Sequence, residues 1–267
     1  MNGRSVLTIV APMVVFVAVV VLWHLISLRN SPLILPGPQA VWEAATEPTG
    51  IWGFEIALPT ESLLSGTWLT AKAALTGLAL SILIGTLVAF AFSQSRFVRS
   101  GFYPYAIFLQ TVPIVAIAPL VIVWFGRGFQ SVVVVAFLIS LFPIITNTTT
   151  GLLSVNNDLR DLFRLHNASW WQSLLKLQFP ISIPYLLAGI KIAAGGAVIG
   201  AIVGEFFVGS TSHGLGYLIR NKSEQLRTDE LFAAVIASTL LCVAVFAAIT
   251  LFGDWVLKRW FGDNESG

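Results

Sequence analysis

The chain has 267 residues, of which 56% are hydrophobic and only 10% charged, and its formal net charge is +2. A soluble domain carries about a quarter of its residues as charged side chains, so this composition excludes a soluble protein and predicts an integral membrane protein. The basic residues flank apolar segments, which is typical of membrane topology signals and argues against nucleic acid binding. One cysteine, Cys242, and three scattered histidines predict neither a disulfide nor a metal site.

Six apolar segments are long enough to cross a bilayer as helices, since about 20 residues span its hydrocarbon core. These segments are residues 6–28, 69–92, 102–125, 131–152, 185–208 and 231–253. We therefore predict an all-α, polytopic protein in which residues 1–267 form one transmembrane domain. The first segment is longer than the apolar core of a signal peptide, about 7–15 residues, and no small-residue cleavage site follows it, so we expect it to be retained.

The basic residues divide unevenly between the two sides that these spans define. With the N-terminus inside, the inner side holds Arg4, Arg96, Arg99, Arg160, Arg164, Lys176, Lys258 and Arg259. The outer side holds Arg29, Arg127, Arg220, Lys222 and Arg227. The excess on the inner side predicts that both termini are cytoplasmic, in agreement with an even number of spans. Residues 153–184, between the fourth and fifth spans, are then a cytoplasmic loop.

Small residues recur every four positions in the second and fifth spans. The positions are Gly77, Ser81 and Gly85 in the second span and Gly196, Gly200 and Gly204 in the fifth. Such stripes let helix backbones approach closely in lipid. They predict either helix packing within the chain or a subunit interface beside a pathway, and both alternatives stay open at this stage.

The third span is irregular, because Pro113 and Pro119 each lack a backbone N–H and disturb a helix. Broken helices at membrane depth occur where the backbone is buried in protein or lines a cavity. We therefore nominate these prolines, with the polar residues Gln110 and Thr111, as candidates for lining a translocation path. A kink that serves only packing is the alternative.

The cytoplasmic loop carries signals for two short helices. Asn157 or Asp158 can cap the first helix, and Asn167 can end it, because asparagine tolerates the left-handed conformation. Ser169, with Gln172 three residues later, forms a capping box that starts the second helix.

We expect Pro180 to end that second helix, which carries the pair Trp170–Trp171. Tryptophans of this kind anchor helices at a membrane surface. The loop is therefore either an interfacial anchor or a knob on which a cytoplasmic partner docks, and the physical signals favour neither.

Charged residues inside the spans are few. Glu205 lies near the outer end of the fifth span, and an acid at that depth usually faces an interior or water. It is a candidate path residue, or a group solvated at the membrane interface. Lys72 and Lys191 lie near span ends, where long side chains reach the interface, and we interpret both as structural.

The cytoplasmic loop resembles the coupling loop of ATP-binding-cassette (ABC) importer permeases, whose pattern is E-A-A, three residues, G, nine residues, I-x-L-P. The positions that match its spacing are Asp161, Leu162 and Phe163 for the first triplet, Asn167 for the glycine, Leu177 for the isoleucine, and Phe179 and Pro180 for the final pair. Arg164 and Ala168 lie within the same motif. Leu162 and Phe163 are bulkier than two alanines, so we expect a dedicated ATPase subunit with a matching groove.

Four further stretches narrow this resemblance. They are LPGPQAVW (35–42), LQTVPIVAIAPLVIVWFGRG (109–128), VGEFF (203–207) and HGLGYLI (213–219). Together they are similar to permeases that import nitrate, sulfonates, taurine, pyrimidine precursors and riboflavin. The resemblance covers nearly the whole chain.

The resemblance implies a type I ABC importer permease fold in a bacterial inner membrane, with six transmembrane helices and a cytoplasmic coupling helix between the fourth and fifth. It implies a second permease copy, with a homodimer favoured over a heterodimer, and a substrate path between the copies. Two cytoplasmic ATPase subunits would bind ATP and Mg, and an external binding protein would deliver the solute. The chain itself is expected to hold no cofactor.

A channel or secondary transporter is the competing transport class, but we find no clear internal repeat of the kind that secondary carriers show. A membrane-embedded enzyme is a third class, but we find no nucleophile–base pair. The phosphate-binding pattern G-x-x-x-x-G-K-[ST] is absent from the sequence, so energy must come from another subunit. The many aromatic residues favour an aromatic vitamin or pyrimidine-type solute, such as riboflavin or a thiamine-pyrimidine precursor, with sulfonate, taurine or nitrate as alternatives.

Overall fold

The structure is a computed structural model that describes residues 3–46, 62–209 and 211–262, and all regular structure in these ranges is helical. This confirms the predicted all-α class. The helices are α1 (Gly3–Ser27), α2 (Pro38–Thr46), α3 (Leu63–Gln94), α4 (Arg96–Thr111), α5 (Ile114–Phe125), α6 (Phe129–Leu153), α7 (Asn157–Leu165), α8 (Trp170–Ser173), the π-helix η1 (Leu174–Gln178), α9 (Phe179–Val208), α10 (Leu215–Glu224) and α11 (Thr228–Phe261).

Within the described ranges, five helical stretches are long and apolar enough to cross a membrane, not six. They belong to α1, α3, α6, the continuous run from α8 through α9, and α11. The third predicted span, 102–125, is irregular as its prolines suggest: these residues form parts of two helices, α4 and α5, and do not make one continuous span. Val112 and Pro113 separate them with extended backbones, since a residue before proline is driven away from the helical region.

The short helix α5 cannot cross a bilayer by itself. It has 12 residues, which at about 1.5 Å per residue is about 18 Å, against about 30 Å of hydrocarbon. Gly126, with φ of 81°, ends it in a conformation that other residues rarely adopt. The third predicted span is therefore a pair of helices that meet at the Val112–Pro113 junction.

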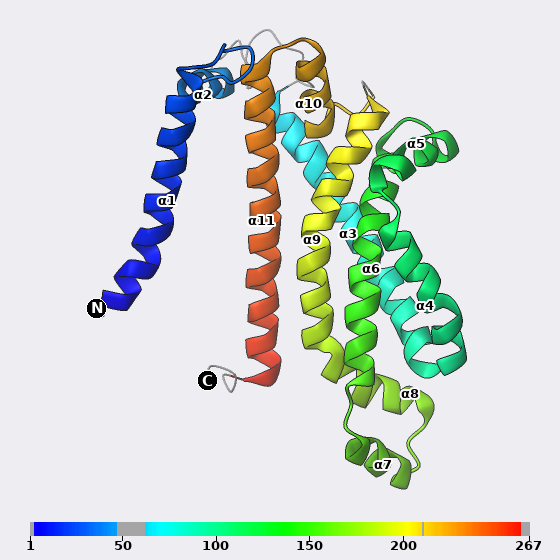
Figure 1. Cartoon of the computed structure of the whole chain (residues 1–267). Helices are drawn as coiled ribbons and strands as arrows, with labels where there is room; N and C mark the ends of the chain where they lie inside the picture. Colours follow the sequence, from blue (N-terminus) through cyan, green and yellow to red (C-terminus); the bar gives the residue numbers. More distant parts are fainter. Residues whose placement is uncertain (1–2, 47–61, 210, 263–267) are drawn as a thin grey trace.

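Helix α6 packs against both α3 and α9, and α3 runs obliquely behind the other two in Figure 1. A methyl group added at Gly77 of α3 or at Gly200 of α9 would lie 2.7 or 2.8 Å from atoms of Ala136 in α6. The remaining glycines of both stripes also face α6, at Ile144 for Gly85, Ile139 for Gly196 and Val132 for Gly204. Ser81 donates a hydrogen bond of 2.8 Å to the Phe137 carbonyl. The two stripes are therefore packing positions within the chain.

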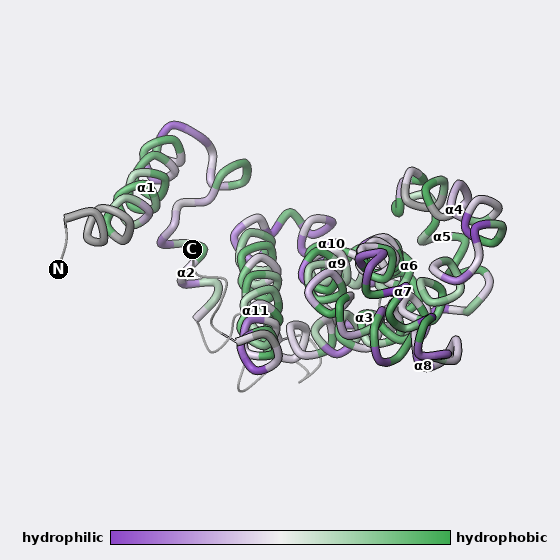
Figure 2. The backbone as a smooth tube through the Cα atoms, turned by 90° about the horizontal axis from the view of Figure 1, so that it is seen from below, coloured by the Kyte–Doolittle hydropathy of each residue, from purple (hydrophilic) through white to green (hydrophobic). Residues whose placement is uncertain are grey.

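The two ends of the bundle differ. Figure 1 shows α2, α5 and α10 at one end, and α7, α8 and the last turn of α11 toward the other. Helix α1 stands apart from the bundle in both views and is hydrophobic around its circumference (Figure 2), with no buried residue over Val10–Ser27. Its C-terminal end is held where Trp23 stacks on Phe232 of α11 at 6.1 Å between ring centres.

Candidate functional site

Helix α7 projects from one end of the bundle and has no buried residue (Figure 1). Three large apolar side chains, Leu159, Leu162 and Leu165, are exposed on it. The N-cap is Asn156, whose side chain accepts a hydrogen bond of 3.1 Å from the Asp158 amide. The prediction of Asn157 or Asp158 as the cap is wrong, because the cap lies one residue before Asn157 and two before Asp158. Both lie inside the helix, and Asn156 has the non-helical backbone that a cap requires.

Helix α7 ends in the conformation that the sequence predicts. Asn167 has φ of 53°, and its amide donates to the Arg164 carbonyl at 2.9 Å. The Ala168 amide donates to the Phe163 carbonyl at 3.0 Å. These two bonds form a Schellman motif with asparagine in place of the usual glycine. The motif fixes the direction in which the chain leaves α7.

The capping box that starts α8 is confirmed. The Ser169 hydroxyl accepts from the Gln172 amide at 3.3 Å, and the Gln172 side chain accepts from the Ser169 amide at 2.8 Å. Trp170 and Trp171 follow with their rings edge to face, 4.2 Å between centres. Because only Asn167 and Ala168 lie between His166, the C-cap of α7, and Ser169, the N-cap of α8, the two helices are joined by a short turn whose hydrogen bonds are all local.

The prediction that Pro180 ends the second helix is wrong. The chain passes from α8 through η1 into α9 as one helical run, Trp170–Val208. In η1 the Phe179 amide donates to the Leu174 carbonyl, five residues back. Pro180 then lies in the first turn of α9, where its missing N–H costs little. The predicted loop 153–184 therefore ends early, and its second half is the start of a long helix.

The start of this long helix is anchored to α3. The Trp170 Nε1 donates to Gln94 Oε1 at 2.6 Å, and Gln94 Nε2 donates to Gln178 Oε1 at 2.9 Å. Phe179 meets Phe90 edge to face at 5.7 Å. Gln94 is the last residue of α3, so a single side chain connects α3 to the first residue of α8 and to the last residue of η1. Composition and period give no signal for such a contact, and the sequence prediction missed it.

The nominated coupling residues fall into two groups. Asp161, Leu162, Phe163, Arg164, Asn167 and Ala168 lie on α7 and the turn after it, and each is exposed or half-buried. Leu177 is buried, and Phe179 and Pro180 are half-buried at the base of α9. We call the first group the knob and the second group the base. Only the knob offers a surface for docking.

The knob has its own small groove. A pocket of about 260 Å³ lies between α7 and the α8–η1 segment and is lined by Leu162, Phe163, His166, Ala168, Gln172 and Lys176. The Arg164–Asp161 ion pair beside it, at 3.1 Å, is exposed on both sides. Such a pair contributes little to stability, so its charges are free to meet a partner.

The candidate path residues Thr111, Pro113 and Pro119 are exposed on the surface of the single chain. Thr111 and Gln110 end α4, Pro113 is the N-cap of α5, and Pro119 lies within α5. The Thr111 hydroxyl donates to the Phe108 carbonyl at 2.8 Å. Gln110, Thr111 and Pro113 thus lie at the α4–α5 junction, Pro119 lies further along α5, and the fifth candidate, Glu205, lies on α9.

Glu205 is 1% exposed and lies among helices α3, α9 and α10. Its carboxylate accepts from the Thr70 hydroxyl at 2.8 Å and from the Gly216 amide at 2.9 Å. The Thr70 hydroxyl in turn accepts from the Leu215 amide at 2.9 Å. Both amides belong to the first turn of α10, where helix N–H groups lack partners within the helix. Glu205 and Thr70 therefore cap α10 from two other helices.

Two glycines make this contact possible. A methyl group at Gly214 would overlap the Glu205 carboxylate, and one at Gly216 would overlap the Ile202 carbonyl. The stretches VGEFF and HGLGYLI, separate in the sequence, thus form one contact. We call Glu205, Thr70, Gly214 and Gly216 the α10 lock. In this conformation its carboxylate faces α10.

The sequence prediction missed the following three ion pairs. Lys222 Nζ lies 2.7 Å from Glu230 Oε2, with the Glu230 side chain 3% exposed, and Arg227 also pairs with Glu230. Lys191 of α9 pairs with Asp254 of α11 at 2.9 Å. Asp254 follows the predicted end of the last span at 253, but α11 continues to Phe261. Lys191 lies inside the predicted fifth span. Had the last span been predicted to run as far as α11 does, Asp254 would also have been placed inside a span, and the two could have been considered as a pair.

Comparison with known proteins decides the family. The family model described as "Binding-protein-dependent transport system inner membrane component" matches residues 81–261. The chain belongs to this family. The matched range runs from the middle of α3 to the last residue of α11 and includes the knob, the base and, except for Thr70, the α10 lock.

Two relatives cover most of the chain. It is 34% identical to the formylaminopyrimidine transport permease protein of Halalkalibacterium halodurans over 251 residues, 93% of this chain and 95% of the relative. It is 31% identical to the riboflavin transport system permease protein of Chloroflexus aurantiacus over 233 residues, 82% of this chain and 85% of the relative. The predicted membership of the ABC importer permeases is confirmed.

A solved structure shows the same fold. A chain from inward facing conformations of the MetNI methionine ABC transporter matches with a TM-score of 0.61 and 18% identity, covering 74% of this chain and 95% of that chain. The predicted type I importer permease fold is therefore confirmed. The chain is a multi-pass membrane protein of this class.

Proposed function

We propose that this chain is the transmembrane permease subunit of a bacterial ABC importer, with both termini in the cytoplasm and α7 as its coupling helix. It works with a second copy of itself, two cytoplasmic ATPase subunits that bind ATP and Mg, and an external solute-binding protein. The chain holds no cofactor and hydrolyses nothing itself. The observation that carries this proposal is the knob: a short helix, capped at both ends, that projects from the bundle and exposes apolar side chains.

The geometry supports transmission of force from the knob to the spans. Exposed apolar side chains such as Leu162 are rarely left on a protruding helix unless a partner covers them. The Schellman motif and the capping box fix the turn between α7 and α8, so a push on α7 moves α8 with it. The Gln94 contacts then pass the movement to α3, and η1 passes it to α9. π-turns are common at such functional joints.

The double variant Asp161→Arg with Phe163→Asp tests the coupling role. It should abolish ATPase binding and solute uptake while membrane insertion stays normal. The change at 161 reverses a charge, and the change at 163 places a carboxylate where the ATPase subunit would cover it. The measurements are co-purification of the ATPase subunit and solute uptake into vesicles. The matched control is Glu43→Arg with Leu33→Asp, the same kinds of change on exposed residues at the opposite end, which should retain ATPase binding. Normal uptake by the knob variant would refute the proposal.

The bulk of Leu162 and Phe163 supports a dedicated ATPase. An ATPase subunit whose groove fits two alanines should dock poorly on this knob. Full transport with an ATPase subunit taken from a related importer would contradict this part of the proposal.

We propose a pyrimidine-type or other aromatic solute for the importer. The support is the 34% identity to a formylaminopyrimidine permease over 93% of the chain, together with the riboflavin relative. The test is uptake of labelled solutes by the complete importer, with its own binding protein present. Formylaminopyrimidine or riboflavin should compete for uptake, whereas competition by taurine or an aliphatic sulfonate alone would overturn the assignment.

A further inference from the structure

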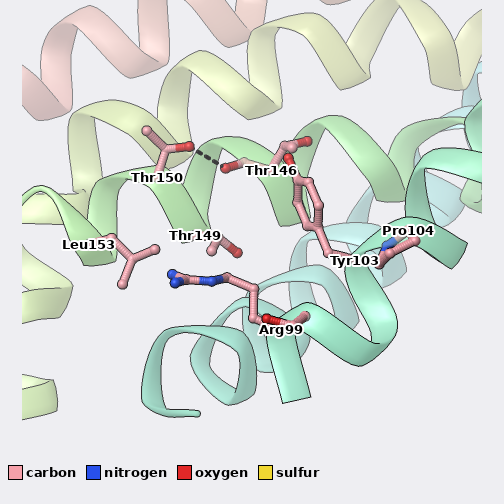
Figure 3. Close-up of a pocket in the computed structure, with 8 residues that line it drawn as sticks. Arg99, Tyr103, Pro104, Thr146, Thr149, Thr150 and Leu153 are labelled. Atoms are coloured by element: carbon pink, nitrogen blue, oxygen red, sulfur yellow. Dashed lines mark hydrogen bonds between the residues drawn. The ribbon is translucent and has the colours of Figure 1, made fainter. Parts of the chain in front are cut away.

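A pocket of about 330 Å³ lies between α4 and α6, in the half of the bundle nearer α7. Its polar lining comes from Arg99, Ser100 and Tyr103 of α4 and from Thr146, Thr149 and Thr150 of α6 (Figure 3). It shares no residue with the knob, the base or the α10 lock. Nothing in the coupling role of α7 requires it.

Thr149 supplies the first observation. Its side chain is 4% exposed, yet its hydroxyl has no hydrogen-bond partner, whereas the neighbouring Thr150 donates to the Thr146 carbonyl at 2.9 Å. A buried hydroxyl without a partner is costly, and such groups in folded proteins usually have a ligand, water or ion to bind. Figure 3 shows Thr149 facing the same space as the Arg99 side chain.

Arg99 supplies the second observation. Arg99 is a half-buried residue, and its guanidinium forms no ion pair within the described ranges. Arg99 is the one charged residue among those that line the pocket, and the other polar side chains there carry hydroxyl groups. A guanidinium presents several N–H donors in a plane that matches the oxygens of a carboxylate, sulfonate or phosphate. The pocket therefore carries positive charge and donors, which exclude a cation as its ligand.

We propose that this pocket binds an oxyanion group, with Arg99 as its charge partner and the Thr149 hydroxyl as a further donor. The shared chemistry has two sources. One is a free oxyanion from the cytoplasm, and the other is the phosphate of an anionic phospholipid, since α4, which lines the pocket, also exposes the large apolar side chains Phe97, Phe102 and Phe108. Under either source, the ligand joins α4 to α6 at the end of the bundle that carries the knob.

The test uses the full chain, purified in a neutral detergent, with two probes. The first is inorganic phosphate at constant ionic strength, followed by calorimetry. The second is extraction from bilayers with equal amounts of phosphatidylcholine and phosphatidylglycerol, followed by native mass spectrometry of the retained lipid. Phosphate binding identifies a free oxyanion, and selective retention of phosphatidylglycerol identifies a headgroup.

Three variants give the expected pattern. Arg99→Gln should weaken the bound probe at least about thirtyfold and Thr149→Val about tenfold, the losses expected for a charge partner and for one hydrogen bond to a charged group. Arg96→Gln, an exposed arginine three residues earlier on α4, should bind as the unaltered protein does. Arg99→Lys keeps the charge and should lose less affinity than Arg99→Gln, which separates loss of charge from misfolding.

The proposal is overturned if the unaltered protein binds neither probe, or if Arg99→Gln binds as strongly as Arg96→Gln. Loss of binding in Arg99→Gln with full binding in Thr149→Val would overturn the role of the hydroxyl and leave the arginine site standing. Uptake by the importer is a separate readout, so failure of this site and failure of the coupling role are distinguishable.

Discussion

At the scale of single residues, the α10 lock places strict requirements on the residues that form it, because it buries a carboxylate against two glycines. A carboxylate at 1% exposure is stable only because two donors, from Thr70 and Gly216, meet it. Its position explains why glycines occupy 214 and 216, where any side chain would overlap the acid or the α9 backbone. Glu205, Thr70 and these glycines depend on one another.

Glu205→Ala should therefore lower the free energy of unfolding by about 2–3 kcal/mol, because the buried Gly216 amide loses its acceptor and the Thr70 hydroxyl keeps only the Gly66 carbonyl. Hydrogen exchange of the α10 amides should rise with it. Thr70→Val should be destabilising too, and the double variant should cost less than the sum of the two, since both act in one network. Additive losses would show that the lock is not a unit.

Glu230 gives a second prediction at this scale. It is buried, so Glu230→Gln removes the carboxylate that pairs with both Lys222 and Arg227 and should cost about 3 kcal/mol. Glu224→Gln, which removes the exposed partner of Arg220, should cost less than about 1 kcal/mol. Thermal unfolding in detergent compares the two variants, and equal losses would contradict the importance of burial here.

At the scale of elements, the approach of α3 and α9 to α6 depends on missing side chains. Gly200→Ala should separate α9 from α6 and destabilise the chain by about 1–3 kcal/mol, because a methyl group would lie 2.8 Å from the Ala136 backbone. The matched control is Gly195→Ala on the same helix, where nothing lies within 4 Å. It should be neutral or stabilising, since alanine favours a helix. A larger loss at 195 than at 200 would contradict this packing.

Local signals in the sequence predict local structure well. Asn167 and the Ser169–Gln172 box end and start helices as expected, because a cap involves only neighbouring residues. Pro180 does not end its helix, because the π-turn before it removes the need for its missing N–H. Patterns of neighbouring residues do not predict the π-turn, because contacts with other helices select it.

Contacts between distant segments could not be predicted. The Gln94 contacts join residues separated by 76 and 84 positions, and the Glu205–Thr70 bond by 135. The spacing of small residues identifies a helix face that packs closely, but it does not identify the helix that packs there. The glycine stripes were therefore predicted from the sequence, whereas their common neighbour, α6, was not. Pro113 does predict the irregularity of the third span, and the structure places the break between α4 and α5 at that residue.

At the scale of the whole molecule, the structure separates a packed bundle from an exposed knob at one end. The bundle is stabilised by close helix contacts and by the α10 lock near the other end. The knob is attached through the base and Gln94, and it contributes little to the core. This division suits a subunit that receives movement at one end and passes it along its spans.

The most direct test of the coupling role uses a cross-linkable cysteine on the knob. Cys242 is the chain's one cysteine, so Leu162→Cys in a Cys242→Ser background carries a single reactive thiol. With the ATPase subunits present, this thiol should form a specific cross-link to them, and the yield should change when ATP is added. Leu226→Cys, an exposed position at the opposite end, should form none. Equal cross-linking at the two positions, or none at 162, would contradict the account.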